Sequence, residues 1–157
     1  MRPTLLAETC TTVPVFVDTN VLVYARDSAD SEKHLRAREW MRELWERRAG
    51  RLSVQVLYEY YVTVTRKLTP GLPVDQARRD VRDLSQWQPL ALDASIVERA
   101  WAEQDSHDLS FWDALVVAAA KRTGCEHLLS EDLQHGQDLG GIAVVSPFLR
   151  EPSEVLS

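Results

Sequence analysis

The residues of this sequence that could do chemistry are carboxylates, and four of them fall at comparable places in the expected fold. Asp18 directly follows a short β-branched run, and Asp132 follows a second apolar run a few residues after its end. Asp113 lies in the first turn of an apolar helical segment, and Glu59 lies about one turn into another. Because strand ends and helix starts meet at one edge of a parallel sheet, all four side chains can point into one crevice.

Such a group of acids needs a counter-charge. Two charges about 5 Å apart repel by roughly 3 kcal/mol at an effective dielectric near 20, so either one carboxylate takes a proton or a divalent cation neutralises the group. Oxygen ligands suit Mg²⁺ or Mn²⁺. Such a cation can polarise a phosphodiester and activate a water molecule for in-line attack on it. The polar Asn20 and Ser130 lie beside two of the acids and are expected in the same crevice.

Each acid also has a purely structural interpretation. Asp18 can cap a following helix, and Asp113 has the Ser-x-x-Asp spacing of a capping box with Ser110. Glu59 can be an ordinary surface residue, and Asp132 can be a loop carboxylate. A first-turn carboxylate can both cap a helix and bind a metal, so the two roles are compatible, and the joint pattern favours a metal site.

Other chemistries fit the sequence less well. Its four histidines show no zinc-like spacing, and it contains neither a GxSxG motif nor a Gly-rich phosphate loop. A phosphatase or phosphotransferase with Asp18 as nucleophile is a rival hypothesis, because Asp-Thr-Asn follows a strand. That chemistry needs a second carboxylate where Asn20 stands and a nearby lysine, whereas Lys121 falls at the far end of its helix.

The elements that must position these acids alternate along the chain. Short strands are expected at 13–18, 51–54, 89–92, 126–129 and 142–145, and helices at 20–26, from 31 to a stop at Gly50, 53–68, 74–85, 93–106 and 110–122. Strands that alternate with helices imply parallel pairing with right-handed crossovers. We therefore expect a three-layer α/β/α fold around a parallel sheet of four or five strands.

Composition bounds the possible classes of protein. The 157 residues fit a single domain over 1–157, and 45% hydrophobic and 27% charged residues are typical of a globular chain. No apolar run reaches the length of a membrane span, and no secretory signal is recognisable. Cys10 and Cys125 form no CxxC pair, which favours a reducing cytoplasm.

The net charge of −6 is unevenly distributed. Residues 1–92 hold 14 basic and 12 acidic side chains, a net of +2, whereas residues 93–157 hold 4 basic and 12 acidic ones, a net of −8. The first part can therefore contact a polyanion, and bound cations can reverse the sign at an acidic site.

Four segments carry a resemblance to a known family. They are FVDTNVLVYA (16–25), LSVQVLYEYYVTVTRK (52–67), LSFWDALVVAAAKRTGCEHLLSEDLQHG (109–136) and GIAVVSPF (141–148). With these segments the chain resembles PIN-domain proteins, and specifically the VapC-type toxin ribonucleases of type II toxin–antitoxin systems. The resemblance covers a core of about 15–148 and leaves residues 1–13 without an assignment.

The resemblance implies a fold, a site and partners. It implies a parallel sheet between helices, and an acidic quartet that carries over without a missing member. The quartet is Asp18, Glu59, Asp113 and Asp132, with Asn20 and Ser130 as polar companions. It also implies Mg²⁺- or Mn²⁺-dependent cleavage of RNA, assembly as a homodimer, and inhibition by a cognate VapB-type antitoxin whose tail occupies the acidic groove.

Together these observations predict a mechanism. Asp18 and Asp113 are expected to make the closest metal contacts, Glu59 and Asp132 to complete the site, and metal-activated water to be the nucleophile. The RNA backbone is expected to contact basic side chains. The candidates are Arg26, Arg66 and Lys67.

Two other PIN-type functions stay open, and so does the assembly. The chain can be a PIN nuclease that processes RNA without being a toxin, or a catalytically silent PIN binding module. Five tryptophans are more than one small core usually needs, so some are expected at the interface of a homodimer.

Overall fold

A four-stranded parallel sheet forms the centre of the computed structural model, which describes residues 12–157. The strands are β1 (Val15–Val17), β2 (Gly50–Arg51), β3 (His127–Leu129) and β4 (Ala143–Val145), in the order β2-β1-β3-β4. All three strand pairs are parallel. The predicted parallel sheet is therefore confirmed, with four strands.

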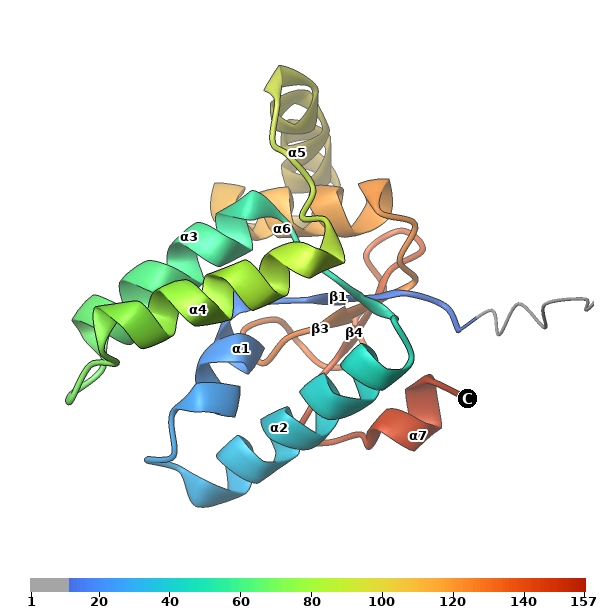
Figure 1. Cartoon of the computed structure of the whole chain (residues 1–157). Coiled ribbons are helices and arrows are strands. Elements are labelled where there is room, and N and C mark those ends of the chain that lie inside the picture. Colours follow the sequence, from blue (N-terminus) through green and yellow to red (C-terminus); the bar gives the residue numbers. More distant parts are fainter. Residues whose placement is uncertain (1–11) are drawn as a thin grey trace, which may run out of the picture.

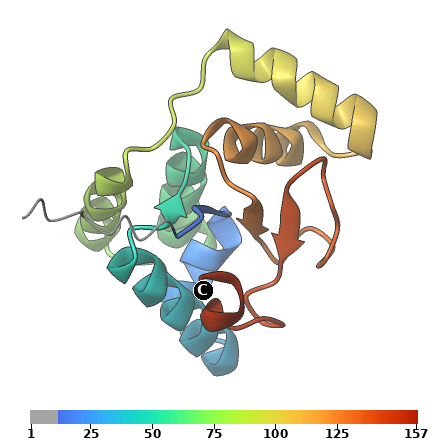
Figure 2. The same ribbon diagram turned by 90° about the vertical axis from the view of Figure 1, so that its right-hand side faces the viewer.

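Helices cover both faces of this sheet. They are α1 (Thr19–Arg26), α2 (Ser31–Glu46), α3 (Val54–Val62), α4 (Val74–Leu84), α5 (Ala94–His107), α6 (Phe111–Arg122) and α7 (Pro152–Val155). Figure 1 shows α1, α2 and α7 on one side of the sheet, and α3 and α6 on the other, with α4 beside α3. In the turned view, α5 lies outside α6 (Figure 2). The expected α/β/α layering is confirmed.

Local chemistry accounts for the starts of three of these helices. Asp30, Asp93 and Ser110 cap α2, α5 and α6, and each accepts a hydrogen bond from a backbone N–H of the first turn. Helix α6 is apolar almost all round, and seven consecutive residues from Ala114 to Ala120 are buried. One side of it faces the main core, which includes Phe16, and the other packs on α5.

The predicted stop of the second helix at Gly50 is wrong. Helix α2 ends at Glu46, and the chain reverses through Arg48, whose φ is +53°. Gly50 instead begins β2, where a Cβ would lie 2.2 Å from the Trp87 ring. This position needs glycine because an aromatic ring packs directly against the backbone.

Three further expectations differ from the structure. The strand expected at 89–92 is reduced to one isolated bridge between Leu90 and Ser53. The helix expected at 53–68 changes at Thr63 into a π-helix, η1 (Thr63–Lys67), in which the Leu68 N–H donates to the Thr63 carbonyl. A short 3₁₀ turn, η2 (Ser85–Trp87), ends α4, and α7 was not expected.

Within residues 12–157, every helix is too short or too polar to cross a membrane.

Candidate active site

Asp18 is the most constrained of the candidate acids. It follows β1 directly, caps α1, and is only 6% exposed. Its Oδ1 accepts a bond from the Thr19 N–H at 2.8 Å, and its Oδ2 accepts bonds from Ser130 Oγ at 2.7 Å and Asn20 Nδ2 at 3.1 Å. The structure thus brings both predicted polar companions into contact with this carboxylate.

Burial raises the pKa of Asp18 to about 6. This pKa is the balance of burial, which raises it most, the hydrogen bonds from Ser130 and Thr19, which lower it, and the charges of Asp132 and Glu59, which raise it. The carboxylate is therefore destabilised as an anion even with its donors in place. Added positive charge would relieve this, which is what a divalent cation supplies.

Glu59 is joined to the end of β1 by a residue that the sequence analysis missed. Thr19 Oγ1 donates to Glu59 Oε2 at 2.9 Å, so Thr19 bridges the two acids with its backbone and its hydroxyl. Gln55, also missed, donates from Nε2 to Glu59 Oε1 at 3.0 Å. The available signals were the position of Thr19 between Asp18 and Asn20, and the i,i+4 spacing of Gln55 and Glu59.

The loop after β3 is hydrogen-bonded to the same residues that surround Asp18. Val17 and Leu129 are register partners, so the residues that follow them emerge side by side. Ser130 Oγ accepts a bond from the Asp132 N–H at 3.2 Å, and Asn20 Oδ1 accepts one from the Glu131 N–H at 3.2 Å. The side chain of Asp132 itself is exposed.

Asp113 is the acid least connected to the others. It lies half-buried in the first turn of α6, where its backbone N–H donates to Ser110 Oγ at 3.1 Å. Its carboxylate forms no hydrogen bond or ion pair with any residue between 12 and 157. The start of α6 is held near α3 by a 3.5 Å contact between Gln55 Nε2 and the Trp112 carbonyl.

Hydrogen bonds therefore link Asp18 to Glu59 through Thr19 and to the Asp132 backbone through Ser130, whereas the Asp113 carboxylate lies outside this network. Glu59 and Asp132 line one cavity of about 580 Å³, together with Thr19 and Asn20. In the described part of the chain, no three Asp, Glu, His or Cys side chains converge closely enough to hold a metal ion. The donor set still fits Mg²⁺ or Mn²⁺ chemically, because it consists of carboxylate and other oxygens, and the buried Gln55 Oε1 beside Glu59 lacks a hydrogen-bond partner.

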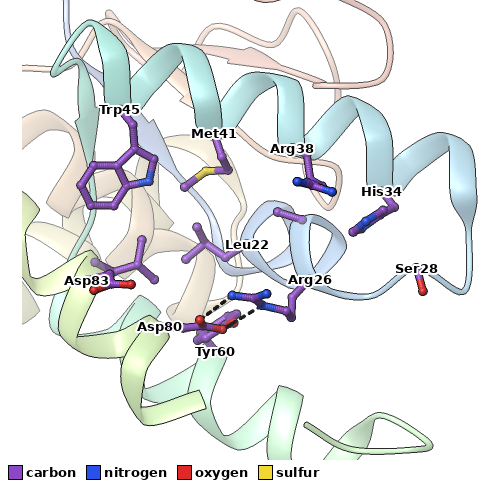
Figure 3. Close-up of a pocket in the computed structure, with 12 residues that line it drawn as sticks. Leu22, Arg26, Ser28, His34, Arg38, Met41, Trp45, Tyr60, Asp80 and Asp83 are labelled. Carbon is purple, nitrogen blue, oxygen red and sulfur yellow. Dashed lines mark hydrogen bonds and ion pairs between the residues drawn. The ribbon is translucent and has the colours of Figure 1, made fainter. Parts of the chain in front are cut away.

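Of the three basic candidates, Arg26 has a structural partner. Its Nε and Nη2 pair with Asp80 Oδ2 and Oδ1 at 2.9 and 2.5 Å, across a second cavity of about 560 Å³ between α1, α2 and α4 (Figure 3). Asp80 is buried and also accepts a bond from the Tyr60 hydroxyl. Arg66 and Lys67 end η1 and are exposed, and Lys67 lines the cavity of the acids.

Comparison with known proteins identifies relatives of this architecture. A family model described as "PIN domain" matches residues 15–137. No curated protein matches the chain in sequence. One similar solved structure is a toxin–antitoxin complex from Klebsiella pneumoniae, with a TM-score of 0.56 and 22% identity over 85% of this chain and 97% of that one. Another is Mycobacterium tuberculosis VapC20, described as a sarcin-ricin-loop-cleaving toxin, with a TM-score of 0.56 and 23% identity over 75% of this chain and 91% of that one.

Proposed function

This chain belongs to the PIN domain family, and from that premise we propose that it is a Mg²⁺- or Mn²⁺-dependent endoribonuclease. The observation that carries the proposal is the buried Asp18, whose pKa rises to about 6 beside Glu59 and Asp132. If Asp18 only capped α1, the nearby charges of Glu59 and Asp132 would destabilise its carboxylate without serving any function. A cation-binding function accounts for all three.

The residues have distinct tasks in this function. Asp18 and Asp113 hold the cation, and Glu59 and Asp132 complete its surroundings. When bound, the cation activates a water molecule and stabilises the charge that develops on the phosphodiester. Thr19, Asn20 and Ser130 orient the carboxylates through the bonds described above, which keeps Asp18 Oδ2 directed at a fixed point. Arg66 and Lys67 contact the RNA backbone.

A cleavage assay tests this proposal. Purified protein is incubated with labelled single-stranded RNA in Mg²⁺, in Mn²⁺ and in EDTA. We expect internal cuts only with a divalent cation, and a loss of at least about 100-fold in rate for Asp18→Asn and Asp113→Asn. The matched control is Asp105→Asn, an exposed aspartate on α5 whose side chain forms no hydrogen bond or ion pair with the described residues. Equal activity of all three variants, or cuts that persist in EDTA, would contradict the proposal.

We further propose that the chain is the toxic component of a VapBC-type module. The support is the likeness of its fold to a chain from a toxin–antitoxin complex and to VapC20. Expression of the chain should then arrest growth, and co-expression of a short neighbouring reading frame should restore it. Cleavage without growth arrest favours the alternative of an RNA-processing nuclease. RNA binding without any cleavage favours a catalytically silent binding module.

A further inference from the structure

The cavity lined by Glu59 and Asp132 also has a lining of different chemistry. Besides the two acids it is lined by apolar and aromatic side chains from α1 and α3. These are Val23, Tyr24, Tyr58 and Val62. At about 580 Å³ the cavity is in the usual size range of ligand sites, which combine apolar walls with a few placed polar groups. Glu59 and Asp132 form only part of its lining.

The two tyrosines that line the cavity differ in how they are held. Tyr24 packs edge-to-face on Phe148, with ring centroids 5.3 Å apart, and Lys33 Nζ lies 5.0 Å from its ring centroid. That ring is therefore fixed by its neighbours. Tyr58 is 69% exposed, and in residues 12–157 it has no aromatic partner. It leaves a large π-surface open beside Glu59.

The π-helix brings a positive charge to the same cavity. The π-helix is closed by the bond from the Leu68 N–H to the Thr63 carbonyl, and Thr63 and Lys67 line the same cavity as Glu59. Single π-turns inside helices often occur at functional sites. Lys67 is exposed and forms no ion pair within residues 12–157, so its ammonium group is free to contact a phosphate.

We propose that this cavity accepts one unstacked nucleobase of the RNA, stacked on Tyr58, while Lys67 contacts the adjoining phosphate. The inference rests on the proposed ribonuclease function and adds a substrate requirement to it. An aromatic face, a single cation and two of the candidate acids line one cavity, and they match the base, the phosphate and the scissile bond of one nucleotide. A base in a duplex is covered on both faces by its neighbours, so the substrate must be unpaired at that nucleotide.

Substitutions at Tyr58 separate stacking from general hydrophobic contact. Tyr58→Leu keeps an apolar side chain on an exposed helical position, and Tyr58→Phe keeps the ring. For cleavage of an unpaired RNA in Mg²⁺ or Mn²⁺, we expect Tyr58→Leu to raise KM about 5- to 150-fold with little change in kcat, because stacking on an aromatic side chain is worth roughly 1–3 kcal/mol per base. Tyr58→Phe should stay close to the wild type.

Abasic substrates locate the base. Each RNA of a series lacks one nucleobase but keeps its phosphate, and its affinity is measured with the inactive Asp18→Asn protein. We expect one position beside the cut to lose most of the affinity, and this loss to disappear in Tyr58→Leu. Pairing that nucleotide in a duplex should suppress cleavage by the wild type.

The outcomes separate this proposal from the one on which it rests. A wild-type protein that cleaves no RNA overturns both. Normal cleavage with an unchanged KM in Tyr58→Leu and a flat abasic series overturns the nucleobase site alone. So does a Tyr58→Leu variant whose assembly mass changes while its RNA affinity does not, because Tyr58 then belongs to a protein interface.

Discussion

Asp18 is a carboxylate whose charged form is opposed by burial and supported by three donors. Its pKa of about 6 lies above the ordinary value of 3.8, so the folded protein holds a proton at pH values where the unfolded chain has lost it. Stability that comes from this proton is present in full below about pH 4. This contribution is lost as the pH rises to about 6, and above that pH Asp18 no longer changes the free energy of unfolding.

The free energy of unfolding in EDTA should therefore fall between pH 4 and 6, with a contribution from Asp18 of up to about 3 kcal/mol. Asp18→Asn, which cannot ionise, should show a flatter profile and be at least as stable as the wild type at pH 7.5. Urea unfolding at a series of pH values measures both proteins, and Asp105→Asn should retain the wild-type slope. Identical profiles for the wild type and Asp18→Asn would contradict this prediction, because they would show that Asp18 has the same pKa in the folded and the unfolded protein.

Asp113 allows the two roles weighed from the sequence to be separated. The cap of α6 uses the backbone N–H of Asp113 and the hydroxyl of Ser110, and the Asp113 carboxylate takes no part in it. Asp113→Asn should therefore leave the free energy of unfolding within about 0.5 kcal/mol while abolishing cleavage. Ser110→Ala should do the opposite, with a loss of about 1 kcal/mol and residual cleavage. Thermal melts beside the cleavage assay decide, and a destabilised but active Asp113→Asn would remove Asp113 from the metal site.

At the scale of elements, Asp80 joins three helices. It lies on α4, pairs with Arg26 at the end of α1, and accepts a bond from Tyr60 on α3 at 2.5 Å. Helices α1 and α3 also carry Asn20 and Glu59, so this contact fixes the two helices that contribute to the candidate site. Asp80 is 8% exposed, whereas the Arg26 side chain is 43% exposed, which moderates the energy of the pair.

Asp80→Ala should lower the free energy of unfolding by about 2–4 kcal/mol, because it leaves the Arg26 guanidinium and the Tyr60 hydroxyl without their buried partner. The control is Asp83→Ala, an exposed position one turn further along the same helix, for which a change of no more than about 0.5 kcal/mol is expected. Chemical denaturation measures both variants. Equal stability of the two would mean that solvent replaces the lost contacts of Asp80 without cost.

The parts of the fold that were predicted correctly are those with a local cause. Asp93 and Ser110 follow the rules for N-caps, and the apolar run after Asp113 indicates a buried helix without reference to any other segment. The parts that were missed depend on distant contacts. Gly50 accommodates Trp87, which is far along the chain, and Asp80 meets Arg26 across 54 positions.

The same distinction applies to the candidate site. Strand ends and helix starts predict that the acids share one edge, because a parallel sheet brings those positions together, and the structure links Asp18 and Glu59 there through Thr19. The hydrogen bond from Thr19 to Glu59 joins residues 40 positions apart and depends on the packing of α1 on α3. The hydrophobic pattern of the sequence predicts each helix but not how the two pack together. Arg26 was a candidate for RNA contact by charge alone, and its buried partner Asp80 became visible only in the folded chain.

At the scale of the whole molecule, the tryptophans fall into two groups. Trp40 is fully buried and donates to the carbonyls of Pro147 and Arg150, and Trp45 packs against Trp87. Trp101 on α5 and Trp112 on α6 are 50% and 63% exposed. Tryptophan is enriched at protein interfaces, since its large ring contributes much contact area.

We therefore predict a homodimer in which at least one of the two exposed tryptophans is covered. Light scattering at tens of micromolar should give twice the chain mass of 17.9 kDa. Trp101→Ser or Trp112→Ser should weaken this association and, as surface changes, leave the melting temperature of the monomer nearly unchanged. Dilution of the wild type should shift its fluorescence to longer wavelength as the covered ring meets water, and the variant that breaks the dimer should lose this shift. A monomeric mass at tens of micromolar would contradict the prediction and leave both rings as exposed surface residues.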